Sequence, residues 1–218
     1  LCVFPETSLL LLEKAIKLAG FLKFSHVVFE FWGTLRFDVM PELAWKDRAY
    51  SKDQMRPLIE TARAMGMQVI PMFNHLGHAT QSRVAFGRHV VLDQNPKHAL
   101  LFEPDGWTWC VSNPAVHELL RAVRLELIEL CGAGDYFHLG CDEAYSYLTC
   151  DVCRQRDGAE VFADYIDGIA SELALQGRRA IIWGDELLSR SEWPRPVIAN
   201  GTELPEVLPQ LDRSIVIA

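Results

Sequence analysis

The stretch Tyr136-Phe137-His138-Leu139-Gly140-Cys141-Asp142-Glu143 decides how the rest of the sequence is interpreted, because in it an apolar run ends in two adjacent carboxylates. A short run of this kind is typical of a strand that is covered on both faces. Since successive strand residues point to opposite sides, we expect one carboxylate to face a pocket and the other to be buried beside it. Two acids this close disfavour simultaneous ionisation, which would keep a proton available for general acid catalysis.

The rest of the chain alternates strand and helix signals in the same way. Besides the run at 136–140, apolar runs predict buried strands at residues 26–32, 68–73, 180–183 and 214–218. Between them, Ser51 and Gln54 have the spacing of a capping box, and Asn113 followed by Pro114 is a favourable helix start. Strands that alternate with helices require crossover connections, and therefore a parallel sheet.

A parallel sheet with helical crossovers is either a doubly wound sheet or a (β/α)₈ barrel. No G-x-G-x-x-G sequence follows any predicted strand, which disfavours a dinucleotide-binding doubly wound sheet. We therefore predict the α/β class, as a partial (β/α)₈ TIM barrel with about five to six parallel strands in a single incomplete domain over residues 1–218. The connection over residues 74–112 is far longer than an ordinary loop, so we expect it to be functional.

The composition excludes several classes of partner. The chain has 21 basic and 29 acidic residues, a net charge of -8, and no stripe of Lys or Arg, so we expect no nucleic-acid partner. No apolar stretch approaches the roughly 20 residues that a membrane helix needs, so no membrane partner is expected. No cofactor is expected either, and the sequence does not determine the oligomeric state.

Six cysteines are spread through the chain, unlike the framework of a small disulfide-rich secreted domain. We therefore expect reduced thiols and a cytoplasmic location, and secretion stays an open alternative. Cys150 and Cys153 have the two-residue spacing of half a zinc site, but no second cysteine pair or nearby histidine pair completes four ligands in the sequence. No metal ligand is therefore assigned, and zinc binding by Cys150 and Cys153 stays an open alternative.

The segment His138-Leu139-Gly140-Cys141-Asp142-Glu143 resembles the H-x-G-x-D-E signature of glycoside hydrolase family 20, the β-N-acetylhexosaminidases and their relatives. Two other segments are similar to family segments in the same order, Asn74-His75-Leu76-Gly77-His78 and Trp183-Gly184-Asp185. The resemblance spans nearly the whole chain. It departs from the family at Glu30, where an acidic and histidine-rich segment is usual, and at Asn74, where many relatives have an aspartate.

The resemblance implies a glycosidase with a carbohydrate substrate, which removes β-linked N-acetylhexosamine (GlcNAc or GalNAc) by a substrate-assisted retaining mechanism. Glu143 would be the general acid and base. Asp142 would orient the 2-acetamido group so that its carbonyl oxygen attacks the anomeric carbon. No nucleophile from the protein is then needed.

The resemblance also implies a set of substrate-binding residues: His78, Asn74, Trp183, Asp185, Glu30 and His138. Purely structural roles compete with several of these. Trp183 suits a core tryptophan as well as a wall against the sugar, and His138 suits a hydrogen-bonded core histidine. In the long connection, Trp107 and Trp109 would either form a rim for further sugar units or hold the connection in place.

Two other functions remain open on the sequence alone. A metal-dependent TIM-barrel hydrolase would use ligands from the set His75, His78, His138, Asp142, Glu143 and Asp185. No helical H-E-x-x-H sequence supports it. A catalytically silent carbohydrate-binding barrel is the other alternative, since one fold supports many functions.

Overall fold

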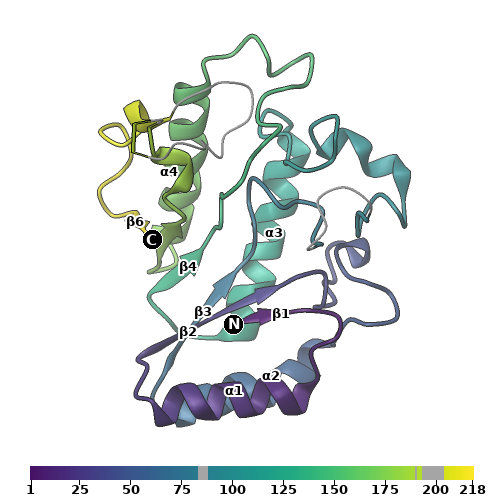
Figure 1. The fold of residues 1–218 in the computed structure, drawn as a ribbon, viewed down its shortest axis with the longest axis vertical. Coiled ribbons are helices and arrows are strands. Elements are labelled where there is room, and N and C mark those ends of the chain that lie inside the picture. The colour runs from purple at the N-terminus through teal and green to yellow at the C-terminus, as the bar shows by residue number, and fades with distance from the viewer. Residues whose placement is uncertain (83–87, 190, 193–203) are drawn as a thin grey trace.

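A computed structural model describes residues 1–82, 88–189, 191–192 and 204–218. Within these ranges the strands form one sheet in which every neighbouring pair is parallel. The strands are β1 (Cys2–Val3), β2 (His26–Phe31), β3 (Gln68–Met72), β4 (Tyr136–His138), β5 (Arg179–Ile182) and β6 (Val216–Ile217). Their order in the sheet follows their order in the chain and never reverses (Figure 1). This order is that of a barrel and not of a doubly wound sheet, which confirms the predicted partial barrel.

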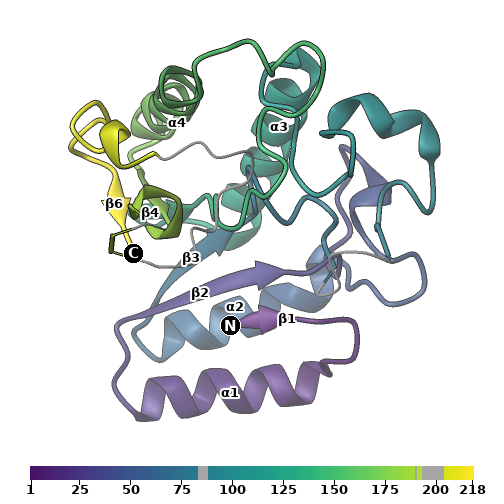
Figure 2. The ribbon, with the colours of Figure 1, turned by 45° about the horizontal axis from the view of Figure 1, so that its top comes forward.

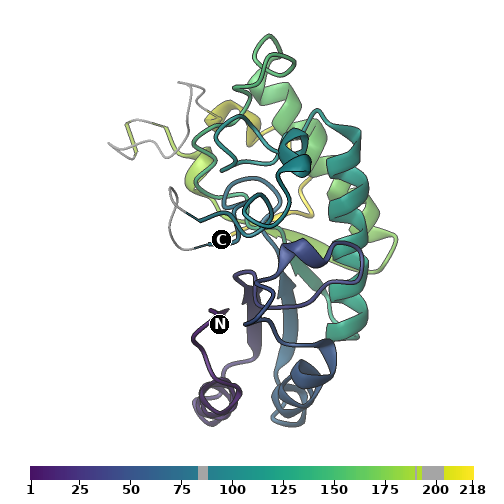
Figure 3. The same cartoon turned by 90° about the vertical axis from the view of Figure 1, so that its right-hand side faces the viewer.

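The main helices form a layer along the outside of the sheet. They are α1 (Leu9–Phe21), α2 (Lys52–Ala64), α3 (Pro114–Cys131) and α4 (Gly158–Ala174). Figure 2 shows α1 and α2 side by side along β1 and β2, and Figure 3 shows α3 running lengthwise beside the strands. Short 3₁₀ helices lie at Pro41–Leu43, Pro96–Leu101, Asp185–Leu187 and Pro205–Val207.

The predicted helix starts are present. The Ser51 hydroxyl accepts a hydrogen bond from the Gln54 N–H at 3.2 Å, and the Gln54 side chain accepts one from the Ser51 N–H at 2.9 Å. Asn113 caps α3 by accepting from the Ala115 N–H at 3.0 Å. Because these contacts are local, they follow from the spacing of the residues in the sequence.

The prediction for the strand at 136–140 was wrong at its end. β4 ends at His138, and Gly140, Cys141 and Glu143 then adopt positive φ values of 69°, 71° and 48°. The alternation expected for Asp142 and Glu143 therefore does not apply, because the chain has left the extended conformation. β1 was not predicted, since a two-residue strand leaves no periodic pattern.

The strands are also less uniformly buried than predicted. In β2, Val27, Phe29 and Phe31 are buried in the hydrophobic core, whereas Val28 and Glu30 are half-buried and line a cavity on the other face. Core residues therefore alternate with half-buried ones along β2, as in a strand that is fully packed on one face only. Among the described helices, none is both long and apolar enough to cross a membrane.

Candidate active site

The two carboxylates of the signature meet at a single histidine. The Nε2 atom of His78 lies 3.2 Å from Oδ2 of Asp142 and 3.3 Å from Oε2 of Glu143. The side chain of His78 is 12% exposed, that of Asp142 24% and that of Glu143 42%. Glu143 is therefore the acid with the better access to a ligand. Both His78 and Glu143 have positive φ values, a conformation that non-glycine residues adopt mainly where surrounding contacts enforce it.

Close backbone packing brings the histidine segment to the carboxylates. A Cβ atom on Gly77 would lie 2.0 Å from the carbonyl oxygen of Asp142. Only glycine therefore lets the backbone at residue 77 approach the backbone at residue 142 this closely. The next residue, His78, is thereby placed over the Asp142-Glu143 pair. His78 belongs to the long connection at 74–112, and a functional role for that connection stays a prediction.

Three groups distant in sequence hold the backbone around Glu143. Asp185 Oδ2 accepts a hydrogen bond from the Glu143 N–H at 3.1 Å, and Glu186 Oε1 accepts one from the Ala144 N–H at 2.6 Å. Trp107 donates from its indole nitrogen to the Glu143 carbonyl at 2.5 Å. Asp185, predicted from the sequence to bind the sugar, is here seen to fix the backbone at Glu143, and its contact with a sugar stays a prediction.

The ring of His78 lies between two tryptophans. Its centroid is 4.5 Å from that of Trp107 and 5.2 Å from that of Trp32. Burial by itself lowers the pKa of His78, but the hydrogen bond and charge of Asp142 and the charge of Glu143 outweigh burial and raise this pKa above its ordinary value. A positive charge on His78 is therefore favoured beside the two carboxylates.

Sequence reasoning missed Tyr145 and Glu186. Burial, then the nearby Glu143 charge and a hydrogen bond to it, raises the pKa of Tyr145 to about 12, so the phenol is a donor to that carboxylate. Glu186 is fully buried, and desolvation raises its pKa to about 8, with a contribution from the charge of Asp185. Burial also raises the pKa of Asp185, with contributions from the charges of Asp142 and Glu143, although the hydrogen bond from the Glu143 N–H acts in the opposite direction. The position of Glu186 directly after Trp183-Gly184-Asp185 was the available signal.

The pocket in front of the carboxylates has a volume of about 700 Å³, and Trp183 forms part of its wall together with Asp142, Glu143 and Asp185. Trp183 is 37% exposed and is therefore not a core tryptophan. His138 packs against the Trp183 ring at 4.4 Å between centroids.

His138 itself is buried and has a structural contact. Its Nδ1 accepts a hydrogen bond from the Gly140 N–H at 3.0 Å, while burial lowers its pKa to about 4. The ring is therefore neutral near pH 7. It supports the Trp183 wall and the turn after β4, and its contact with a sugar stays a prediction.

Asn74 and Glu30 form a second polar pair deeper in the sheet. The Asn74 side-chain amide donates to Glu30 Oε1 at 3.2 Å, and Asn74 is 2% exposed. A Cβ atom on Gly140 would lie 2.1 Å from Asn74 Oδ1, which explains the glycine in the signature. Glu30 lies near the end of β2 and Asn74 follows the end of β3, and these two strands are neighbours in the sheet. Contact of either residue with a substrate stays a prediction.

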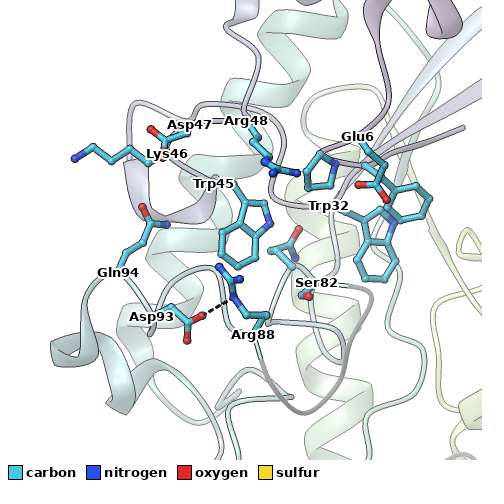
Figure 4. Close-up of a pocket in the computed structure, with 13 residues that line it drawn as sticks. Glu6, Trp32, Trp45, Lys46, Asp47, Arg48, Ser82, Arg88, Asp93 and Gln94 are labelled. Atoms are coloured by element: carbon cyan, nitrogen blue, oxygen red, sulfur yellow. Dashed lines mark hydrogen bonds and ion pairs between the residues drawn. The ribbon is translucent and has the colours of Figure 1, made fainter.

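A separate pocket of about 660 Å³ is lined by residues that include Trp32, Trp45 and Arg88 (Figure 4). Arg88 stacks over the Trp45 ring at 4.8 Å and forms an ion pair with Asp93 at 3.2 Å. Neither Asp142 nor Glu143 lines this pocket. The two predicted catalytic carboxylates therefore line the first pocket and not this one.

The ligand set of the metal-dependent alternative does not assemble as a whole, although His78 contacts both Asp142 and Glu143. His75 is completely buried, with Nδ1 2.6 Å from the Phe73 carbonyl oxygen, and burial holds its pKa well below its usual range. Within the described ranges, the one group of three or more potential metal ligands with mutually close donor atoms contains Glu103 and three cysteines, and none of the proposed residues.

Comparison with known proteins identifies the family. Residues 32–202 match the family described as glycosyl hydrolase family 20, catalytic domain. The chain is 26% identical over 160 residues to a β-hexosaminidase of Porphyromonas gingivalis, a match that covers 69% of this chain and 20% of that protein. It spans between 20% and 29% of the length of the curated relatives it matches.

Solved structures share the fold. A β-N-acetylhexosaminidase from Bacteroides fragilis aligns with a TM-score of 0.68 at 20% identity, over 97% of this chain and 42% of that one. An exo-β-N-acetylglucosaminidase from Vibrio harveyi, solved in complex with N-acetylglucosamine, aligns with a TM-score of 0.67 at 15% identity, over 97% and 35% of the two chains. With the match over residues 32–202, the chain belongs to the catalytic domain of glycosyl hydrolase family 20.

Proposed function

We propose that the protein containing this chain is a β-N-acetylhexosaminidase that removes terminal GlcNAc or GalNAc from β-linked substrates. The observation that carries the proposal is the convergence of Asp142 and Glu143 on His78 at the wall of a pocket that also contains Trp183. Family membership and the N-acetylglucosamine complex of the Vibrio harveyi enzyme support a sugar of this class.

Glu143 is the proton donor in the proposed mechanism. It gives its proton to the glycosidic oxygen while the bond from that oxygen to the anomeric carbon breaks. At the same time the carbonyl oxygen of the substrate's 2-acetamido group forms a bond to the anomeric carbon, which produces an oxazolinium ion. The leaving alcohol departs with the proton, and Glu143 is left as a carboxylate that acts as the base of the second step.

Asp142 stabilises the charged intermediate. Its carboxylate faces the acetamido nitrogen, whose N–H becomes positively polarised as the ring closes, and His78 holds the other side of the carboxylate at 3.2 Å. Water then attacks the anomeric carbon and gives a proton to Glu143, which opens the oxazolinium ring with overall retention. Trp183 excludes water from the apolar side of the sugar.

The first experiment measures hydrolysis of aryl β-N-acetylglucosaminide and aryl β-N-acetylgalactosaminide by the full-length protein. Replacement of Glu143 by Gln is expected to lower kcat by roughly 10²–10⁴-fold, because it removes the proton donor at nearly constant shape. The matched control is Glu129→Gln, since Glu129 is exposed on α3, and this variant is expected to keep the wild-type rate. Equal rates for wild type and Glu143→Gln would remove Glu143 from the mechanism.

A second comparison tests the role of the acetamido group. The aryl β-glucoside has a hydroxyl in place of this group, and we expect its kcat/KM to fall by orders of magnitude relative to the N-acetyl substrate. Asp142→Asn should abolish most of this discrimination. Comparable rates on both substrates would contradict substrate assistance, and tight sugar binding without turnover would favour the silent binding barrel.

A further inference from the structure

Three of the six cysteines come together at one place with a buried carboxylate. One donor atom from each of Glu103, Cys110, Cys150 and Cys153 lies within 4.8 Å of all the others. The Cys110 sulfur is 3.8 Å from that of Cys150 and 3.6 Å from that of Cys153. Cys110 and Glu103 belong to the long connection at 74–112, whereas Cys150 and Cys153 follow the signature, so the sequence alone does not reveal the group.

Glu103 is a second, independent sign of a ligand. It is 1% exposed, and its Oε2 accepts hydrogen bonds from the Thr149 N–H at 3.0 Å, the Thr149 hydroxyl at 3.2 Å and the Cys150 N–H at 2.6 Å. Its Oε1 is buried and has no hydrogen-bond partner among the described residues. A buried carboxylate oxygen without a partner is costly unless a cation satisfies it.

The spacing of the sulfurs fits one particular metal. In a tetrahedral site with Zn–S bonds of about 2.3 Å, two sulfurs lie about 3.8 Å apart. The observed separations of 3.6 and 3.8 Å agree with that value. They are far longer than the roughly 2.0 Å of a disulfide bond. Three thiolates with one carboxylate favour Zn²⁺ over Mg²⁺ or Ca²⁺, which prefer all-oxygen sites.

We propose that Cys110, Cys150, Cys153 and Glu103 bind one structural Zn²⁺ ion. The three thiols lose their protons on binding, and Oε1 of Glu103 occupies the fourth position while Oε2 keeps its hydrogen bonds. The four ligands close the coordination sphere, so the ion has no open position for a substrate. The pair Cys150 and Cys153 is half of this site, and the fold supplies the other half.

The ion would fasten the long connection to the segment after the catalytic acid. Two nearby contacts cross the same boundary, since the Ser146 hydroxyl donates to Thr108 at 3.0 Å and Trp107 donates to the Glu143 carbonyl. Zinc would thus stabilise the position of Trp107 against Glu143 without touching the reacting atoms. This role is one of positioning.

Metal content measured by mass spectrometry tests the proposal without any substrate. We expect the full-length protein, expressed with added zinc and purified under reducing conditions, to contain about one Zn²⁺ per chain. Cys153→Ser should reduce the content at least fivefold. The control Cys131→Ala, at a buried free cysteine in α3 outside the cluster, should retain the ion. Zinc below a tenth of an equivalent in the wild type, or unchanged in Cys153→Ser, would overturn the proposal.

X-ray absorption at the zinc edge of the wild-type protein tests the ligand set even where a cysteine variant does not fold. Three sulfurs at about 2.3 Å and one oxygen at about 2.0 Å are expected. Glu103→Gln, which keeps the shape of the side chain, should weaken zinc retention against a chelator. A zinc-free protein with a disulfide from Cys110 to Cys150 or Cys153, detected as a mass lower by two hydrogens, would contradict the site. Neither metal content nor X-ray absorption depends on hydrolytic activity. A failure of the zinc proposal can therefore be told apart from a failure of the hydrolase proposal.

Discussion

The indole nitrogen of Trp107 donates a hydrogen bond of 2.5 Å to the backbone carbonyl of Glu143, across 36 residues of sequence. Trp107 is 3% exposed and also stacks on Tyr145 with a centroid distance of 5.9 Å. Of the two roles considered for this tryptophan, a rim for further sugars or an anchor for the long connection, its burial and its hydrogen bond favour the anchor. The backbone at Glu143, the proposed proton donor, is therefore held in part by the long connection.

Replacement of Trp107 by Phe should lower activity through Glu143. The variant keeps an aromatic ring but leaves the Glu143 carbonyl without its donor, a loss of about 1–3 kcal/mol. We expect kcat/KM to fall by roughly tenfold or more, mainly through kcat, because the proton donor is less well oriented. Trp45→Phe, in the separate pocket of Figure 4, is the matched control and should retain activity. If the two variants were equally active, the hydrogen bond would have no role in orienting Glu143.

Replacement of His78 by Gln should change the pH dependence as well as the rate. The two carboxylates raise the pKa of His78, so the histidine carries positive charge to a higher pH than a free imidazole. Gln keeps a donor but removes the positive charge that lies 3.2 Å from Asp142 and 3.3 Å from Glu143. We expect the acidic limb of the plot of kcat/KM against pH to move to higher pH, by a fraction of a pH unit or more. His117→Gln, exposed on α3, should leave the profile unchanged.

Replacement of Glu186 by Gln should stabilise the protein at alkaline pH. The folded protein holds the Glu186 proton up to a pKa of about 8, whereas the unfolded chain loses it near 4.5. Between these values the folded state binds more protons, so the free energy of unfolding contributed by this group falls as pH rises from about 4.5 to about 8. Gln can still accept from the Ala144 N–H and has no charge to bury.

Thermal unfolding at pH 5 and pH 8 measures the effect of Glu186→Gln. The advantage of the variant over wild type should be larger at pH 8, on the order of a few kcal/mol at most. Glu60→Gln, at an exposed position of α2, is the control and should show no such difference between the two pH values. A variant that is less stable than wild type at pH 8 would mean that the buried group is ionised and paired.

Replacement of Gly140 by Ala separates steric conflict from backbone strain. Gly140 has φ of 69°, and an added Cβ would lie 2.1 Å from Asn74 Oδ1. Gly66 has φ of 82° with no atom within 4 Å of the added Cβ, so Gly66→Ala carries the strain alone. We expect Gly66→Ala to cost about 1–2 kcal/mol and Gly140→Ala to cost about 1–3 kcal/mol more, measured by denaturant unfolding. Equal costs would show that Asn74 moves aside freely.

The sequence by itself determined the parts of this protein that depend on neighbouring residues. The helix starts at Ser51 and Asn113 and five of the strands follow from capping residues and apolar runs, because hydrogen bonds and periodicity within about ten residues decide them. The signature ending in Asp142-Glu143 likewise indicated the family directly, and the match over residues 32–202 agrees with it.

Only the tertiary structure decided which residues meet. The turn after β4 brings Asp142 and Glu143 to one histidine and not to opposite sides of a strand, and Glu186 gains its raised pKa from burial that no local pattern records. The sulfurs of Cys110 and Cys153 lie 3.6 Å apart although 43 residues separate them. Contacts of this kind depend on how the strands are ordered in the sheet and on how the long connection packs across their carboxyl ends. No local spacing in the sequence encodes that packing.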